Sequence, residues 1–251
     1  MSMPRLYCDL PLQGADLVSL PPGAARHVQV LRLQPGDALT LFDGRGGEYD
    51  AQVQHMGRQE VQVRVGEHHA IEREAPTVVH LVTGMPANER MDWLVEKATE
   101  LGVAHIVPVL TERTVVRLAG ERASKRLAHW LAIAVSACEQ SGRDVLPQIG
   151  PIASLREGLN WAMQDQPQAC RIRLSLAPEA TPWGQLKPGH PSLCAVLGPE
   201  GGFSASEELV LQQAGWAPVS LGDSVLRTET AALTVLARWA DAGLSTSRPP
   251  Q

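Results

Sequence analysis

The segment Leu197-Gly-Pro-Glu-Gly-Gly-Phe-Ser204 combines residue types that can hold a ligand. Its three glycines and its proline leave backbone N–H and C=O groups free to approach a bound molecule closely. The segment is neither a Walker loop nor a dinucleotide fingerprint, since GxxxxGKS, GxxxxGKT and GxGxxG are all absent. Because Glu200 would repel a pyrophosphate, we expect a cradle for another class of ligand at the carboxyl edge of a sheet. A glycine-rich turn with a purely structural role is the alternative.

A second segment, Leu221-Gly-Asp-Ser-Val-Leu-Arg-Thr-Glu-Thr-Ala231, also leads from a strand through a glycine into a helix. It places Arg227 and Glu229 beside the start of that helix. An acidic side chain next to backbone donors suits a ligand with a positive charge and an adenosine, and S-adenosylmethionine is such a ligand. A buried ion pair between Arg227 and Glu229 is the alternative, because helix starts attract carboxylates in any case.

The amino-terminal part of the chain has the pattern of short strands. Apolar residues alternate with polar ones over residues 37–42, 49–53 and 61–65, and a glycine-rich turn occupies residues 43–47. This pattern predicts a small β-barrel. Residues 66–76 are polar and end in a proline, which predicts an exposed connection, and we place the domain boundary between residues 72 and 73.

Beyond this boundary, strands and helices alternate, which predicts an α/β domain with a parallel sheet. A strand at residues 78–82 is followed by a helix whose apolar face runs from Met91 to Leu101, and then by a strand at residues 103–110. Ser204 and Glu207 have the spacing of a capping box. The remaining expected elements are a helix over 127–138, strands at 171–176, 192–197 and 218–221, and a last helix from about Thr228.

Composition limits the class of protein. The chain of 251 residues has 44% hydrophobic and 20% charged residues, which is typical of a globular enzyme. It has no apolar run long enough for a membrane helix and no signal peptide, so we expect a cytoplasmic protein with no membrane contact. Cys8, Cys138, Cys170 and Cys194 are scattered, and the histidines follow no ligand spacing, so we expect no metal and no disulfide.

The charge composition argues against nonspecific binding to nucleic acid but permits local recognition. A formal net charge of -5 is unusual for proteins that coat nucleic acid. However, the 22 basic residues are 19 arginines and three lysines, and guanidinium groups bind phosphate with two hydrogen bonds and stack on bases.

The two glycine segments resemble those of the RsmE family, the SPOUT-class 16S ribosomal RNA uridine-N3 methyltransferases, whose ends typically read LxGPEGGxS and LGxRILRTETA. The resemblance spans nearly the whole chain, in the family's order, through residues 4–7, 27–33, 92–103, 111–113 and 137–143. The chain departs from the family at Ser224, where arginine is frequent, and near Pro86-Ala87, where a lysine-glycine pair is frequent.

The resemblance implies a fold, a cofactor and partners. It implies an N-terminal PUA-like β-barrel in residues 1–72 that helps to hold RNA, and a C-terminal SPOUT-type parallel sheet with a trefoil knot in residues 73–251. It implies S-adenosylmethionine as the cofactor, 16S ribosomal RNA of the small ribosomal subunit as the substrate, and a homodimer. The implied cofactor contacts are Leu176, Leu197, Gly198, Pro199, Glu200, Gly201, Gly202, Leu221, Gly222, Val225, Leu226, Arg227, Thr228, Thr230 and Ala231.

The chemistry that the family performs needs a base and a cation. Uracil N3 carries a weakly acidic proton, so attack on a methyl donor requires that this proton leaves and that the charge on O2 and O4 is stabilised. We expect Arg227 to stabilise the anion and Glu229 to accept the proton, with Glu200 or Glu139 as alternatives. The expected RNA contacts are Arg5, Arg32, Lys97, Arg113, Glu139, Gln140 and Arg143.

Two other functions fit the same sequence. One is a related methyltransferase that acts on transfer RNA or on a ribose hydroxyl, since a fold does not fix the substrate. The other is a catalytically silent RNA-binding assembly factor that keeps the cradle.

Overall fold

The computed structural model describes residues 3–14, 16–58, 60–87, 89–116, 118–186 and 190–247, with side chains up to residue 241. Contacts divide the chain into two compact units. The first contains Met1–Glu74 and Val135–Leu146, and the second contains Ala75–Ala134 and Pro147–Gln251. The boundary expected between residues 72 and 73 divides the chain into two continuous parts. In the structure, the later segment Val135–Leu146 also belongs to the first unit.

The first unit is built on a five-stranded sheet with the order β1-β3-β4-β5-β2. Val61, Val63 and Val65 alternate toward its core, as the period of two predicts. β1 runs parallel to β3, and the other neighbouring strands are antiparallel. The elements are β1 (Arg5–Tyr7), β2 (Leu17–Ser19), α1 (Pro22–Val30), β3 (Ala38–Phe42), β4 (Glu48–Met56) and β5 (Val61–His69). The expected strands are confirmed, but β5 extends into the expected connection, because His68 and His69 pair with β4.

The second unit contains an eight-stranded sheet in which every pairing is parallel, as expected from the alternation of strands and helices. Its order is β11-β13-β10-β12-β6-β7-β8, and β9 pairs with β7. The strands are β6 (Val78–Gly84), β7 (Val103–Leu110), β8 (Gln148–Ile149), β9 (Ala153–Ser154), β10 (Cys170–Leu174), β11 (Thr181–Pro182), β12 (Ser192–Leu197) and β13 (Ala217–Ser220). β12 lies between β6 and β10, both of which precede it in the chain.

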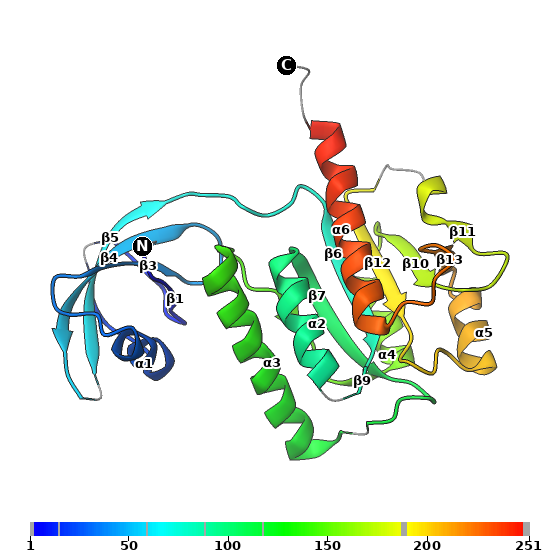
Figure 1. The fold of residues 1–251 in the computed structure, drawn as a ribbon, viewed down its shortest axis with the longest axis horizontal. Helices are drawn as coiled ribbons and strands as arrows, with labels where there is room; N and C mark the ends of the chain where they lie inside the picture. Colours follow the sequence, from blue (N-terminus) through cyan, green and yellow to red (C-terminus); the bar gives the residue numbers. More distant parts are fainter. Residues whose placement is uncertain are drawn as a thin grey trace. The chain divides into compact units, whose positions relative to one another are not determined.

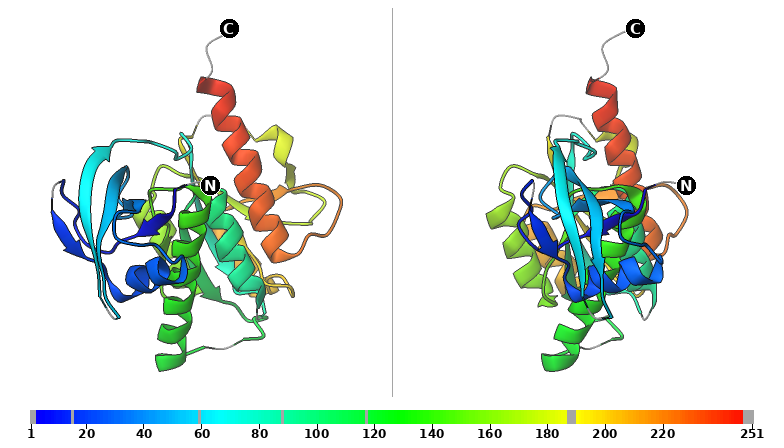
Figure 2. Two further views of the ribbon diagram at one scale, coloured as in Figure 1. Left: turned by 60° about the vertical axis from the view of Figure 1, so that its left-hand side comes forward. Right: turned by 90° about the vertical axis from the view of Figure 1, so that its left-hand side faces the viewer.

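Helices cover both faces of this sheet (Figure 1). They are α2 (Glu89–Glu100), α3 (Gly120–Ser141), α4 (Leu155–Asp165), α5 (Ala205–Gln213) and α6 (Thr228–Ser247), with a 3-10 turn at Trp183–Gln185. Leu81 of β6 belongs to the core formed with α2 and α6, whereas its neighbour Val82 belongs to the core formed with α4 and α5. Figure 2 shows α4 and α6 on opposite sides of the sheet. Both faces of the strands are therefore buried, which explains their continuous apolar sequences.

The parallel sheet brings four chain segments together at one edge. β6 ends at Gly84, β12 at Leu197, β10 at Leu174 and β13 at Ser220, and these strands are neighbours. Because carboxyl ends of parallel strands meet at the same edge, both glycine segments meet there. The capping box of Ser204 and Glu207, predicted from the sequence, starts α5 directly after the first segment.

A pair of histidines, the buried His80 and the partly buried His105, lies near the opposite, amino-terminal ends of β6 and β7. Nδ1 of His80 lies 3.0 Å from Nδ1 of His105, and Nε2 of His105 lies 2.8 Å from Oε1 of Gln148. Since Oε1 only accepts, His105 donates from Nε2 and accepts at Nδ1 from His80. Nε2 of His80 then has no hydrogen-bond partner among the described residues. Burial and the neighbouring His105 lower the pKa of His80 from 6.5 to about 4.

We expect the stability of the fold to decrease as the pH falls from about 6.5 to about 4. In this range the unfolded chain binds a proton at His80 and the folded chain does not, so acid favours unfolding. The linked loss is at most about 3 kcal/mol. Urea unfolding at pH 7 and pH 4.5 measures it. His80→Gln should flatten this dependence relative to His190→Gln at an exposed histidine, and an equal pH dependence in the two variants would contradict the assignment.

The described residues contain no membrane-spanning helix and no metal-binding group, and their cysteines are free. Every helix within them is too short or too polar to cross a lipid bilayer. They contain no group of three or more His, Cys, Asp or Glu side chains that could hold a metal ion. The four cysteines are free, and burial raises the pKa of the Cys194 thiol to about 12. Cys8, Cys138 and Cys194 are buried, so these cysteines act as small core side chains.

Candidate functional site

A cavity of about 760 Å³ lies at the carboxyl edge of the sheet in the second unit. Its walls combine backbone of both glycine segments, apolar side chains and a few charged groups. Residues predicted for the cofactor that line it are Leu176, Leu197, Gly198, Pro199, Glu200, Gly202, Leu221, Gly222, Val225, Leu226, Thr228 and Ala231. Gly201, Arg227 and Thr230, also predicted for the cofactor, are not among its lining residues.

The first glycine segment forms a compact turn that only glycine can build. Gly202 has φ +66°, in the left-handed region, and its N–H donates to the carbonyl of Pro199 at 2.8 Å. A Cβ on Gly198 would lie 3.2 Å from both Cα and the carbonyl carbon of Gly202. The hydroxyl of Thr228 donates to the carbonyl of Gly198 at 2.9 Å. This bond ties the start of α6 to the turn, so the two glycine segments form one wall.

The end of β6 supports the same turn from behind. A Cβ on Gly84 would lie 2.5 Å from Cδ and 2.6 Å from N of Pro199, which is closer than real Cβ contacts. The absent side chain of Gly84 therefore allows β6 and the turn to touch. Arg113 holds the other side, because its Nη1 donates to the carbonyl of Gly201 at 2.8 Å.

Two carboxylates at the turn share one arginine. Oε1 of Glu200 accepts from the N–H of Ala87 at 3.0 Å and from Nη1 of Arg90 at 2.9 Å. Burial alone would raise the pKa of Glu200, but these two donors hold it below its usual value. Nε of Arg90 lies 4.0 Å from Oε1 of Glu229. Oε2 of Glu229 is buried and has no hydrogen-bond partner among the described residues.

Arg227 does not pair with Glu229. Its side chain is exposed, and neither an ion pair nor a hydrogen bond connects it to Glu229 within the described part of the chain. Arg90 instead provides the cation closest to Glu229. The buried pair of Arg227 and Glu229 that the sequence left open is therefore not formed.

The α5 side of the cavity was not predicted from the sequence motifs. Arg173 at the carboxyl half of β10 forms an ion pair with Glu208 of α5, and Nε of Arg173 donates to the carbonyl of Trp216. The additional lining residues are Arg173, Leu174, Ser175, Ala177, Glu179, Phe203, Ala205, Glu208, Leu209, Gln212, Val219 and Ser224. Arg173 is a charged residue near the end of a strand, and this position is the sequence signal that could have predicted this side of the cavity.

The residues predicted to contact RNA belong to both units. In the second unit, Arg113 is exposed and lies beside the turn, whereas Lys97 pairs with Glu96 and Glu100 on α2. In the first unit, Arg32 and Gln140 are exposed, and Arg32 has φ +58° directly after α1. Glu139 accepts from the N–H of Tyr7 at 3.0 Å. Their contacts with RNA stay a prediction.

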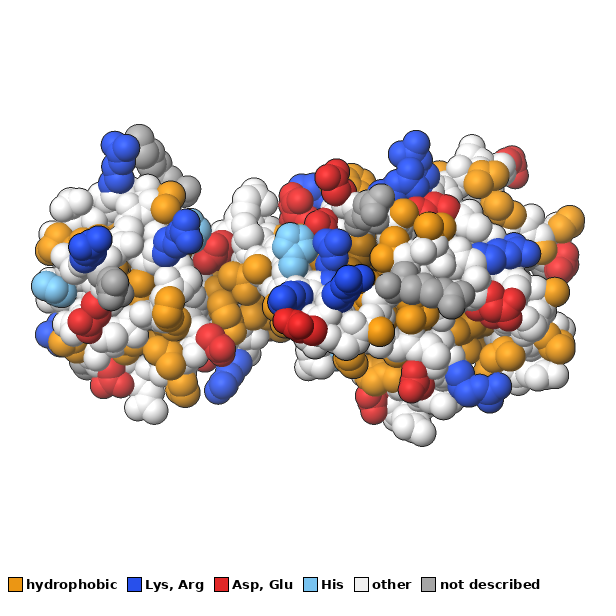
Figure 3. Space-filling model, turned by 90° about the horizontal axis from the view of Figure 1, so that it is seen from below, with side chains coloured by type: hydrophobic (Ala, Val, Ile, Leu, Met, Phe, Trp, Pro, Cys, Tyr) orange, Lys and Arg blue, Asp and Glu red, His pale blue; other side chains and the backbone are white. Residues whose placement is uncertain are grey.

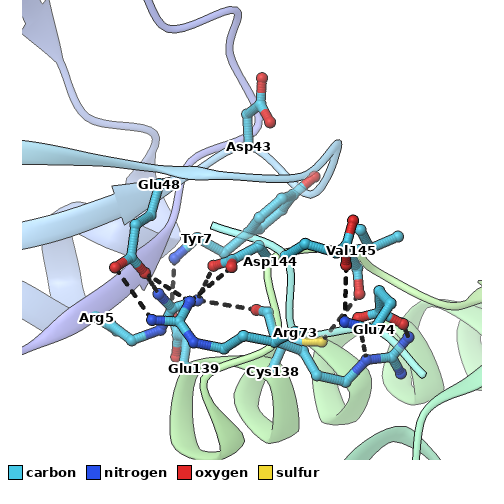
Figure 4. Close-up of polar contacts among 12 residues, drawn as sticks. Arg5, Tyr7, Asp43, Glu48, Arg73, Glu74, Cys138, Glu139, Asp144 and Val145 are labelled. Carbon is cyan, nitrogen blue, oxygen red and sulfur yellow. Dashed lines mark hydrogen bonds and ion pairs between the residues drawn. The ribbon is translucent and has the colours of Figure 1, made fainter. Parts of the chain in front are cut away.

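Arg5 belongs to a network of charges in the first unit, together with Glu48, Arg73 and Asp144 (Figure 4). Asp144 is 2% exposed and binds Arg5 at 2.7 Å and Arg73 at 2.6 Å through its two carboxylate oxygens. Both arginines also reach Glu48, whose pKa they hold below its usual value although burial would raise it. The network fastens the return segment 135–146 to β1 and β4.

Arg143 is 5% exposed and binds Glu74 through two hydrogen bonds, from Nε at 2.9 Å and from Nη2 at 2.5 Å. An RNA contact by Arg143 therefore requires this ion pair to open. We expect Arg143→Ala to lower the free energy of unfolding by about 3 kcal/mol, because it leaves a carboxylate without its partner. Thermal unfolding of Arg143→Ala beside Arg122→Ala, at an exposed position on α3, measures this effect. Equal unfolding temperatures would indicate that the pair contributes nothing to the fold.

Comparisons with known proteins agree with this architecture. A family model described as an RNA methyltransferase domain matches residues 73–240, and an RNA methyltransferase PUA domain model matches residues 20–66. Ribosomal RNA small subunit methyltransferase E of Mycobacterium bovis is 34% identical over 223 residues, which are 87% of this chain and 82% of that protein. The Bacillus subtilis protein of the same name is 31% identical and is covered over 83% of both chains.

Two solved structures are similar over almost their whole length. Ribosomal RNA small subunit methyltransferase E from Neisseria gonorrhoeae, bound to S-adenosyl methionine, is 37% identical with a TM-score of 0.88, covering 94% of this chain and 96% of that one. A methyltransferase from Legionella pneumophila, in complex with SAM, is 35% identical with a TM-score of 0.89, covering 97% and 99%. The expected α/β fold with an N-terminal PUA domain is thus confirmed. Matches of this extent show that the chain belongs to the RsmE family of RNA methyltransferases.

Proposed function

We propose that this protein transfers a methyl group from S-adenosylmethionine to N3 of a uridine in 16S ribosomal RNA of the small ribosomal subunit. The observation that carries the proposal is the cavity between the two glycine segments at the carboxyl edge of a parallel sheet. Membership of an RNA methyltransferase family and relatives named for the small-subunit ribosomal RNA support the choice of substrate.

The residues of the cavity fit this cofactor chemically. Its volume of about 760 Å³ is within the range of pockets that hold ligands of this size. Leu176, Leu197 and Leu226 would contact the adenine ring, and the backbone around Gly198 and Gly222 would bind polar groups. Glu200 provides the negative charge that suits a cationic ligand. When bound, S-adenosylmethionine supplies a methyl group on a positively charged sulfur.

The protein's own part in the chemistry is the preparation of the uridine. Glu229 would accept the N3 proton, since Oε2 of its carboxylate has no partner among the described residues. Arg227 would stabilise the charge that develops on O2 and O4, because its guanidinium is exposed beside the start of α6. Glu200 and Glu139 remain the alternative proton acceptors.

RNA would be held by a limited set of arginines rather than by a continuous basic surface. In the face drawn in Figure 3, a few Lys and Arg side chains gather beside a histidine near the middle, and the others are scattered among Asp, Glu and hydrophobic side chains. This distribution agrees with the net charge of -5 and favours selective recognition over coating. We further propose that the protein works as a homodimer and that the last part of the second unit forms a trefoil knot, as in the family it resembles.

The direct test is methylation of small ribosomal subunits that lack this modification. Purified protein is incubated with these subunits and S-adenosylmethionine carrying a labelled methyl group, and the nucleosides are identified by mass spectrometry. We expect labelled 3-methyluridine at one position, and no label in subunits that are already modified. Label on a ribose hydroxyl or in transfer RNA would replace the proposed substrate, and cofactor binding without transfer to any RNA would identify a silent binding factor.

A further inference from the structure

Arg90 was not predicted as a site residue, but its guanidinium interacts with two acidic side chains from different segments. It lies in the first turn of α2, which follows β6. Its Nη1 donates to Oε1 of Glu200 at 2.9 Å, and its Nε lies 4.0 Å from Oε1 of Glu229. Glu200 lines the cavity, while Glu229 is 6% exposed and lies in the sequence between the lining residues Thr228 and Ala231. The three side chains form what we call the acidic triad, Glu200–Arg90–Glu229.

With both carboxylates ionised, the triad carries one positive and two negative charges and therefore a net charge of about -1. Arg90 neutralises one carboxylate, and the second leaves an uncompensated negative charge close to the cavity, because Glu200 lines it and Glu229 directly follows the lining residue Thr228. Among the other charged lining residues, Arg173 and Glu208 neutralise each other as an ion pair, and Glu179 is exposed. The triad is thus a source of net negative potential at the cavity that no lining arginine neutralises.

We infer that the acidic triad makes the cavity select the positively charged methyl donor over its neutral demethylated product, and that Arg90 sets the strength of this selection. The inference rests on the proposed function, because it assumes that these two molecules occupy the cavity. A negative wall lowers the free energy of the cationic sulfonium and leaves that of the uncharged thioether unchanged. Product then leaves more readily than donor, which reduces inhibition by product.

Two substitutions should change this selection in opposite directions. Arg90→Gln changes the net charge of the triad to about -2, and Glu229→Gln changes it to about 0. The ratio of the dissociation constant of S-adenosylhomocysteine to that of S-adenosylmethionine should therefore rise about threefold in Arg90→Gln and fall about threefold in Glu229→Gln. Loss of packing alone would weaken both ligands together and leave the ratio unchanged.

Isothermal titration calorimetry of the full chain at pH 8 and low ionic strength, with S-adenosylmethionine and S-adenosylhomocysteine in turn, measures this ratio without methyl transfer. Arg90→Lys keeps the charge and should keep the wild-type ratio. Glu121→Gln removes a carboxylate that is 81% exposed on α3, far along the chain from the triad, and should also leave the ratio unchanged.

The outcomes separate the inference from the proposed function. If the wild-type protein binds neither molecule, the proposed function is wrong. If it binds both but the ratio is the same in Arg90→Gln, Glu229→Gln and the wild type, only the inference is wrong. Circular dichroism shows whether each variant folds. If Arg90→Gln does not fold, the fall in Glu229→Gln and the unchanged ratio in Arg90→Lys still decide the question.

Discussion

Replacing Gly84 by alanine is expected to weaken the binding of S-adenosylmethionine about tenfold or more while the second unit stays folded. The new Cβ would lie 2.5 Å from Cδ and 2.6 Å from the backbone nitrogen of Pro199, and 3.1 Å from the carbonyl carbon of Gly198. These atoms belong to a ring and to backbone, which cannot rotate away as a long side chain can. The turn must move away from β6, and the cavity wall that it forms moves with it.

Two other glycines provide matched controls for Gly84→Ala. Gly184 has no atom within 4 Å of its Cβ position, so Gly184→Ala should preserve both affinity and stability. A Cβ on Gly158 of α4 would lie 2.6 Å from a side-chain carbon of Val109, so Gly158→Ala should lower stability without changing the cavity wall. Calorimetry for affinity and thermal unfolding for stability distinguish the three variants. Unchanged affinity in Gly84→Ala would mean that the turn is not part of the cofactor site.

Substituting Glu229 by glutamine is expected to slow methyl transfer about a hundredfold in a single turnover with saturating cofactor. Glutamine has nearly the shape of glutamate but cannot accept the proton from N3. Glu229→Gln is also expected to change the affinity for S-adenosylmethionine. Because the cofactor is saturating, this change does not affect the measured rate, which reports the chemical step. The rate at which the labelled methyl group is transferred to undermethylated small subunits is measured.

Glu200→Gln is the matched comparison for Glu229→Gln, because Glu200 shares Arg90 and is the alternative acceptor. A large loss in Glu229→Gln with a small loss in Glu200→Gln assigns the proton to Glu229. The reverse result would assign it to Glu200, which lines the cavity directly. A normal rate in Glu229→Gln would remove Glu229 from the chemistry altogether.

The sequence predicted the layout of the second unit well because its signals are local. Alternating strands and amphipathic helices identified β6, α2, β7 and α6, and the spacing of Ser204 and Glu207 identified the start of α5. The same spacing occurs at Ser154 and Glu157, where the structure has a capping box at the start of α4. This helix was not predicted, although Leu155, Leu159 and Ala162 recur at helical spacing. Helix α1 was missed because it has only nine residues, although the proline at its first position is a helix-start signal.

What the sequence could not predict depends on contacts between distant segments. Arg90 and Glu200 are 110 residues apart, and only the order of strands in the sheet brings them together. The ion pairs of Arg5 and Arg143 likewise join β1 and the connection after β5 to the return segment 135–146. A motif shows which residue types are present, but their partners are fixed by the sheet order. The turn-like sequence around Arg143 therefore does not indicate that its side chain is buried.

The place of β12 between two earlier strands affects how the protein is made. During synthesis, β6 and β10 leave the ribosome before β12, so each first exposes a strand edge that no later neighbour has yet covered. The walls of the cavity are complete only when residues 192–231, in the last quarter of the chain, have emerged. A nascent chain halted before this point would bury its amino-terminal sheet and still have no place for the methyl donor, so truncated products would be inert rather than partly active.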